Sequence, residues 1–361
     1  MTAPTPDRSA RRRHDGAVGE IFAIQARNLA LTTVTVGIYR FWARTRIRRY
    51  LWNHMSFEGD ALEYTGTGRE LFLGFVIVAL VLAFASGAYR VIDVIVLATF
   101  PVLALVLNVV LVAGFFLLTG VALYRARRYR LSRTLWRGIR GAQTGSAVLY
   151  GLKYLGYWAL NVLSAGWTYP WMRMRLMHQM MNNTWFGDRR FHFDSRSGPL
   201  YDRFAAVWAV VFLALVVSAS TAYLAIFTTG FEVTELEKIA PSLILIMLLP
   251  VLFTILSIIL GMTWYKAREY AYIASSARYE GLTFRLDTTF GSFLWLVVGN
   301  YLIRALSLGL GAPFAQMRTF RYVCDRLSIS GEADFEAIRQ SSEARPGLGE
   351  GLEAAFDLGD F

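Results

Sequence analysis

The chain has 361 residues, of which 55% are apolar, and its mean hydropathy is +0.40, which is high for a soluble protein of this length. The formal net charge is +11. No recognisable nucleic-acid-binding module accompanies the basic residues, so anionic lipid, and no nucleic acid, is the expected counter-charge. The single cysteine, Cys324, excludes an intramolecular disulfide.

A basic segment, residues 1–15, comes first and lacks the apolar run of a signal peptide. We expect a disordered cytoplasmic tail there, followed by a single membrane domain over residues 16–331. The first module, residues 18–70, contains GIYRFWARTR, in which Trp42 follows Gly37 by five residues and Arg46 follows it by nine.

The segment after this glycine, WARTRIRRYLWNHM, separates basic and apolar residues at helical spacing. Arg44 and Arg48 share one face, and Ile47 and Leu51 share another. This pattern predicts an amphipathic helix that lies on the inner leaflet.

Two pairs of apolar segments are long enough to cross about 30 Å of hydrocarbon. They cover residues 71–89 and 94–118, and then 204–227 and 241–264. The links inside each pair carry few basic residues, whereas the links between the pairs are rich in arginine. Because short basic loops stay on the cytoplasmic side, both pairs are predicted to be transmembrane hairpins with short outer turns.

The motif of the first module returns twice, as GWTYPWMRMR from Gly166 and as GLGAPFAQMR from Gly309. The copies are roughly 130 to 140 residues apart, which predicts related modules at 137–195 and 281–331. The third copy departs from the others in having Gln316 where they have arginine. The residues that we expect to serve a lipid-binding or structural task are Gly37, Trp42, Arg44, Arg46, Gly166, Pro170, Trp171, Arg173, Arg175, Gly309, Pro313, Phe314 and Arg318.

The apolar parts of the later modules create a conflict over topology, because each is long enough to be read as a span. A single crossing at 147–167 would place the following arginines outside, against the charge rule. We therefore favour an all-α polytopic membrane protein with two hairpins and three re-entrant or amphipathic modules. The alternative is six or seven spans arranged as inverted repeats.

Several polar residues fall in these apolar segments, where burial requires a partner. They are Asn28, Asn108, Asn161, Asn300 and Arg304. Lone amides more often tie helices together than contact a substrate. After residue 331 the chain becomes acidic, and we expect residues 332–361 to be disordered.

Catalytic patterns are missing from the sequence. The four histidines are scattered, and no HExxH, paired CxxC or GxSxG arrangement is present. We expect no enzyme activity, no metal and no cofactor.

The run from Glu20 through Gly74, especially NLALTTVTVGIYRFWARTRIRRYLWNH and YTGTGRELFLGF, resembles the YjgN family of bacterial inner-membrane proteins, a domain class of unknown function. The resemblance covers Gly16 to Gly331. It implies several spans in the bacterial inner membrane, and the charge pattern adds cytoplasmic termini. It supplies no activity or ligand. The sequence thus favours an inner-leaflet platform for anionic lipids or protein partners, with a small-solute or lipid transporter or channel as the alternative.

Overall fold

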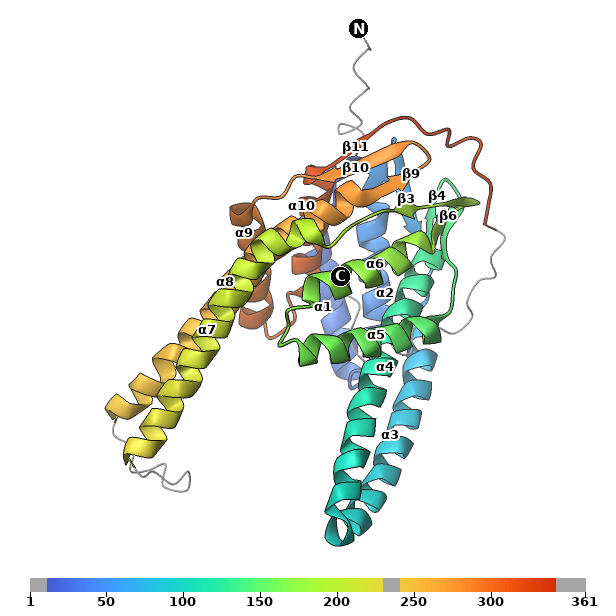
Figure 1. Cartoon of the computed structure of the whole chain (residues 1–361). Helices are drawn as coiled ribbons and strands as arrows, with labels where there is room; N and C mark the ends of the chain where they lie inside the picture. The colour runs from blue at the N-terminus through green and yellow to red at the C-terminus, as the bar shows by residue number, and fades with distance from the viewer. Residues whose placement is uncertain (1–11, 230–240, 342–361) are drawn as a thin grey trace.

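The computed structural model describes residues 12–229 and 241–341. The described chain is mostly helical, with short strands gathered at one end (Figure 1). The all-α expectation is therefore wrong in one respect, because it omitted these strands.

The described helices are α1 (Val18–Val34), α2 (Arg40–Asn53), α3 (Gly68–Thr99), α4 (Pro101–Arg133), α5 (Ala147–Leu163), α6 (Tyr169–Asn182), α7 (Gly198–Thr229), α8 (Pro241–Ser276), α9 (Phe290–Leu306) and α10 (Ala312–Arg326). The described strands are β1 (Arg12–His14), β2 (Met55–Phe57), β3 (Asp60–Tyr64), β4 (Thr134–Trp136), β5 (Ile139–Gln143), β6 (Thr184–Phe186), β7 (Arg189–Arg190), β8 (His192–Phe193), β9 (Ala277–Tyr279), β10 (Leu282–Leu286) and β11 (Leu327–Ser330).

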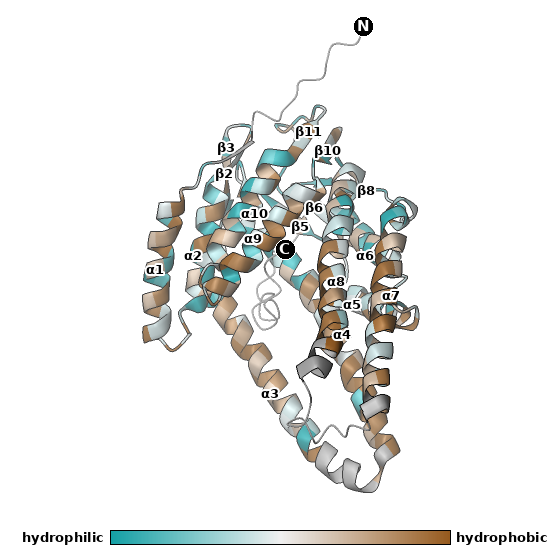
Figure 2. Cartoon of the chain, turned by 90° about the vertical axis from the view of Figure 1, so that its left-hand side faces the viewer, coloured by the Kyte–Doolittle hydropathy of each residue, from teal (hydrophilic) through white to brown (hydrophobic). Residues whose placement is uncertain are grey.

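Four of the helices are long and apolar enough to cross a membrane, over Gly68–Ile92, Val102–Arg133, Gly198–Ala225 and Leu248–Ser276. They extend away from the strands, and Figure 2 shows apolar residues along them. Only 6% of the most apolar window of α4 is buried within the chain. A helix that is apolar all round and uncovered by protein is suited to lipid.

The boundary between the first two spans differs from the expected one. The segment 94–118 was expected to form the second span, but α3 continues to Thr99 and α4 begins at Pro101. Proline has no backbone N–H and a fixed φ, so it is favoured in the first turn of a helix. The turn between the spans therefore lies at Phe100, further along the chain than the arginine-poor link suggested.

Each helix pair in the described chain is closed by two strands that pair with each other. β1 pairs with β2 around α1 and α2, β3 with β4 around α3 and α4, and β5 with β6 around α5 and α6. The pairings of β8 with β9 and of β10 with β11 repeat this around the last two helix pairs. Both ends of every described helix pair therefore lie at the end of the molecule where the strands β1 to β11 gather (Figure 1). These strands together are called the strand layer below.

Tight hairpins link one strand pair to the next. Their turns contain Glu58 and Gly59, then Arg137 and Gly138, then Glu280 and Gly281, and all six residues have positive φ angles. Two successive residues in this region form a type I′ turn, whose twist matches that of paired strands. The hairpins build a sheet with the order β1-β2-β3-β4-β5-β6-β7 and a second with the order β11-β10-β9-β8.

The described helices pack in chain order around a ring. α2 contacts α3, α4 contacts α5, α6 contacts α7 and α8 contacts α9. The ring closes where α10 meets α1 and α2, through a core that includes Ile21, Ile47, Leu51 and Met317. Chain neighbours and one closing contact are therefore enough to define the architecture.

An aromatic core joins the strand hairpins to the segment 332–341. The Trp136 ring lies 5.3 Å from Phe57, 5.8 Å from Phe186 and 5.0 Å from Phe335. Ile338 is buried in the same core. The first ten residues of the segment expected to be a disordered tail thus pack on the sheet, while residues 342–361 lie outside the described part of the chain.

Gly187 offers a test of this contact, because a Cβ there would lie 2.4 Å from the carbonyl oxygen of Arg339 and 2.5 Å from Ile338. Gly59 also has positive φ, but a Cβ there meets nothing within 4 Å. We expect Gly187→Ala to lower the free energy of unfolding by about 1–3 kcal/mol more than Gly59→Ala, and to expose Arg339 to trypsin. Denaturant unfolding in detergent and limited proteolysis measure both effects. Equal destabilisation by the two variants would contradict the contact.

Candidate functional site

The motif glycines form the turns between the two helices of each module. Gly37, Gly166 and Gly309 have φ angles of +89°, +86° and +88°. Each glycine N–H donates to the carbonyl five residues earlier, over 2.7–2.8 Å. The hydroxyls of Thr35 and Ser307, two residues before their glycines, accept a backbone N–H at the start of the next helix. The three turns therefore share one geometry.

The tips formed by these turns expose apolar side chains at equivalent positions. Three residues before the glycine, Val34, Leu163 and Leu306 are 80%, 84% and 83% exposed. One residue before it, Val36 and Leu308 are 91% and 92% exposed. Such side chains are unfavourable in water, so the tips are candidates for contact with lipid.

The arginines nine residues after each glycine lie on the second helix of each module. Arg46 donates to Oδ1 of Asn28 at 3.3 Å, and Arg318 donates to Oδ1 of Asn300 at 3.2 Å. The guanidinium of Arg175 lies 5.8 Å from the centre of the Trp171 ring. Among the described residues, none of the three arginines has a carboxylate within ion-pair distance. Each of the three guanidinium groups is therefore oriented by a neutral neighbour.

The arginine seven residues after the glycine has a different environment in the second module. Nε of Arg173 lies 2.9 Å from Oε1 of Glu269 on α8, and Nζ of Lys266 lies 2.7 Å from Oε2. Lys266 also donates to the hydroxyl of Tyr169 at 2.6 Å. The Glu269 side chain is completely buried. The arginine at the equivalent position of the first module, Arg44, is half-buried. Two cations thus share one carboxylate at the contact of α6 with α8.

Electrostatics fixes the charge states on α6. Burial and then the charge of Glu269 raise the pKa of the Tyr169 phenol to about 12, so Tyr169 is neutral at physiological pH. Burial alone would lower the pKa of Arg173, but Glu269 and Tyr169 raise it above its ordinary value. Arg173 is therefore a permanent cation in this cluster.

The remaining polar residues predicted from the sequence form hydrogen bonds within their own helix pairs. Asn161 is buried, and its Oδ1 accepts from the Thr168 hydroxyl at 3.4 Å. Asn108 accepts from the Tyr89 hydroxyl at 3.0 Å and joins α3 to α4. The carbonyl of Arg304 accepts the N–H of Gly309 in the third turn. These contacts connect neighbouring segments and assemble no shared polar centre.

The aromatic and proline members of the motif have packing contacts. A Cβ at Gly68 would lie 2.7 Å from the Trp42 ring, so that ring covers the start of α3. Phe314 packs on the core that closes the helix ring. Pro170 and Pro313 are buried in the first turns of α6 and α10. These residues support the tips.

The apolar face predicted for α2 is covered by other helices of the chain. Its apolar residues Ile47 and Leu51 pack against α1 and α10. Arg48 is buried and donates to the Tyr64 hydroxyl. The apolar face is occupied by protein because the ring closes on this side.

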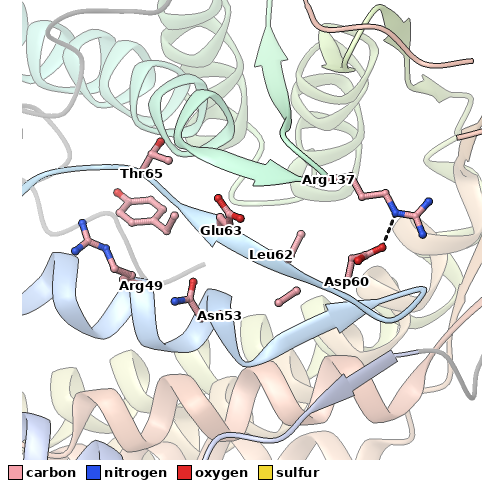
Figure 3. Close-up of a pocket in the computed structure, with 9 residues that line it drawn as sticks. Arg49, Asn53, Asp60, Leu62, Glu63, Thr65 and Arg137 are labelled. Atoms are coloured by element: carbon pink, nitrogen blue, oxygen red, sulfur yellow. Dashed lines mark hydrogen bonds and ion pairs between the residues drawn. The ribbon is translucent and has the colours of Figure 1, made fainter. Parts of the chain in front are cut away.

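A hollow of about 570 Å³ lies where α2 faces β3 (Figure 3). Arg49, Asn53, residues 60–65 and Arg137 line it. Arg137 is paired with Asp60 at 2.5 Å, and Arg49 donates to the carbonyl of Gly66 at 3.3 Å. No motif residue or predicted amide lines it. No group of metal-ligating side chains occurs in the described ranges 12–229 and 241–341.

Glu269, Lys266 and Tyr265 are absent from the predicted site residues because the fourth span was expected to end at Trp264, whereas α8 continues to Ser276. The available signal was charge, since KARE brings two bases and an acid directly after an apolar run. Such residues at the edge of a span need partners nearby.

The fold defines a helical membrane protein with four candidate spans. The chain matches the family described as "Bacterial protein of unknown function (DUF898)" over residues 9–355, and it belongs to that family. It is 35% identical over 66 residues to the inner membrane protein YjgN of Salmonella typhimurium (strain LT2), a match that covers 18% of this chain and 17% of that relative. The resemblance to YjgN is thereby confirmed. No solved structure matches the chain.

The buried carboxylate provides a test of the cluster. Glu269→Gln leaves Arg173 and Lys266 without a counter-charge, and we expect it to lower the free energy of unfolding by about 3–5 kcal/mol. Asp287→Asn is the control, because Asp287 pairs with Arg285 at the surface and both side chains are exposed. Denaturant unfolding in detergent should show no measurable change for this control. A Glu269→Gln variant as stable as the control would contradict the buried network.

Proposed function

We propose that this protein is a lipid-binding platform of the bacterial inner membrane. In this account, α3, α4, α7 and α8 cross the bilayer as two hairpins, and the three modules enter the cytoplasmic leaflet and return. The observation that carries the proposal is the repeated combination of an exposed apolar tip with an arginine that has no acidic partner among residues 12–229 and 241–341.

The depth of these groups fits one leaflet. The arginine lies six residues into the second helix of each module, as Arg46 does in α2, which corresponds to about 9 Å at 1.5 Å per residue. Interfacial elements insert by about 5–10 Å. With the apolar tip among the acyl chains, the guanidinium reaches the level of the lipid phosphates. Arginine forms bidentate hydrogen bonds to phosphate, and each basic residue near an anionic surface contributes about 1 kcal/mol.

The strand layer supports the four-span topology. Both ends of α5 and α6 meet at β5 and β6, so this helix pair enters and leaves on one side. The same layer contains Arg137, Arg189 and Arg285, which favours its placement in the cytoplasm. Residues 12 and 341 both belong to the described chain beside this layer, and we extend the cytoplasmic placement to the two termini, which lie outside the described residues.

A transporter or channel with inverted repeats is the weaker hypothesis. It requires the second module to point opposite to the third, whereas each of these modules is closed by strands of the same layer. We therefore propose a binding role without transport or enzymatic chemistry.

The test replaces the three equivalent arginines, in the variant Arg46→Gln, Arg175→Gln and Arg318→Gln. In bilayers that contain phosphatidylglycerol and phosphatidylcholine, electron paramagnetic resonance of spin-labelled lipids measures which lipid the protein retains at its boundary. We expect the preference for phosphatidylglycerol to fall about fivefold, as the loss of about 1 kcal/mol at each site requires.

The matched control, Arg189→Gln, Arg278→Gln and Arg285→Gln, removes the same charge from strands β7, β9 and β10. It should retain the preference. An equal loss in both variants would show that only net charge matters, and no loss in the first variant would refute the lipid-binding role of the arginines.

A further inference from the structure

The cluster of Arg173, Lys266 and Glu269 lies between the second module and the second hairpin. We propose that it binds the phosphate group of one phospholipid molecule, which is held between α6 and α8. The inference rests on the proposed placement of the module tips in the inner leaflet. It goes beyond the proposed lipid-binding platform, because it assigns one specific lipid site to residues other than Arg46, Arg175 and Arg318.

The charges of the cluster leave capacity for an anion. Both carboxylate oxygens of Glu269 are used, one by Nε of Arg173 and the other by Nζ of Lys266. Among the described residues, no hydrogen-bond partner occupies the two terminal nitrogens of Arg173. The side chains of Arg173 and Lys266 remain 31% and 20% exposed, so the cluster is open on the side of its cations. Two cations and one carboxylate match a phosphodiester, which carries a single negative charge.

A buried hydroxyl beside the cluster supplies independent evidence. Tyr265 is 0% exposed, and its hydroxyl has no hydrogen-bond partner in the described structure. Its ring centre lies 6.1 Å from that of Tyr169 and 5.9 Å from Nζ of Lys266. A buried hydroxyl without a partner is costly, and a phosphate oxygen that enters beside the two cations is an acceptor suited to it.

The position of the cluster favours a lipid over a dissolved ion. Lys266 lies ten residues before the end of α8, which places it about 15 Å from the strand layer towards the apolar part of the helix. Arg173 lies four residues into α6, near the tip of the second module. Trp208 donates to the carbonyl of Ala165 at 2.8 Å, and Tyr201 donates to that of Trp167 at 3.2 Å, so amphipathic aromatic side chains surround the tip. Such residues are typical of the headgroup layer.

The test removes only one oxygen atom, through Tyr265→Phe. The control is Tyr272→Phe, seven residues further along the same helix towards the strands, where the hydroxyl already has a partner because it accepts the N–H of Arg196. The full-length protein is extracted from membranes, washed extensively in mild detergent, and assayed for lipid phosphorus per chain. We expect the native chain and Tyr272→Phe to retain one phospholipid, and the affinity of Tyr265→Phe to fall about tenfold.

Further measurements separate the outcomes. Thermal unfolding shows whether Tyr265→Phe is folded, and delipidated protein is titrated with radiolabelled inorganic phosphate. Binding of inorganic phosphate without retained lipid would overturn the lipid source, while equal lipid retention by Tyr265→Phe and the native chain would overturn the site. The variant Arg46→Gln, Arg175→Gln and Arg318→Gln tests the two proposals separately. If it loses the preference for phosphatidylglycerol but still retains one phospholipid per chain, the specific site is independent of the lipid-binding platform.

Discussion

Antiparallel pairing between the strands that flank each helix pair is the constraint on which this structure depends. β3 pairs with β4 across the first long hairpin, and β5 pairs with β6 across the second module. These ladders satisfy backbone groups that would otherwise be exposed at the ends of the helices. They also bring the start and end of every described helix pair to the same end of the molecule.

The helix pairs that start from these strands differ in length and in hydrophobicity. The long hairpins carry apolar residues far beyond the layer, whereas the modules are shorter and turn back at their glycines. The exposed tips and the arginines behind them follow from that length difference. One strand layer thus carries two long apolar hairpins, which contain the four candidate spans, and three shorter modules.

Much of the helix arrangement can be predicted from patterns in the sequence. The four candidate spans follow from long apolar runs, and the three turns follow from the repeated glycines, because positive φ favours glycine. The strands were missed because each has only two to five residues, which is too short for an alternating pattern to be distinguished beside the long helices. A signal was nevertheless present, since an aromatic residue, a variable residue and a glycine recur as Phe57 to Gly59, Trp136 to Gly138 and Tyr279 to Gly281.

The charged cluster was less predictable. Arg173 was identified from its repeated spacing, but its partner Glu269 lies 96 residues away on α8. No local pattern connects the two, because their contact depends on how the second module packs against the second hairpin. Tyr265 was missed for the same reason, since its burial is a property of the packed ring.

The location of the strand layer is the most direct test of the account. Single cysteines are placed at Asp60, Arg189 and Arg285 in that layer and at Phe100 between the first two spans, with the buried Cys324 replaced by serine. Labelling of intact cells with a membrane-impermeant maleimide should modify only the cysteine at 100, with the three layer positions labelled after lysis. Labelling at 189 in intact cells, with 60 and 285 protected, would place the second module on the opposite side and contradict the common layer.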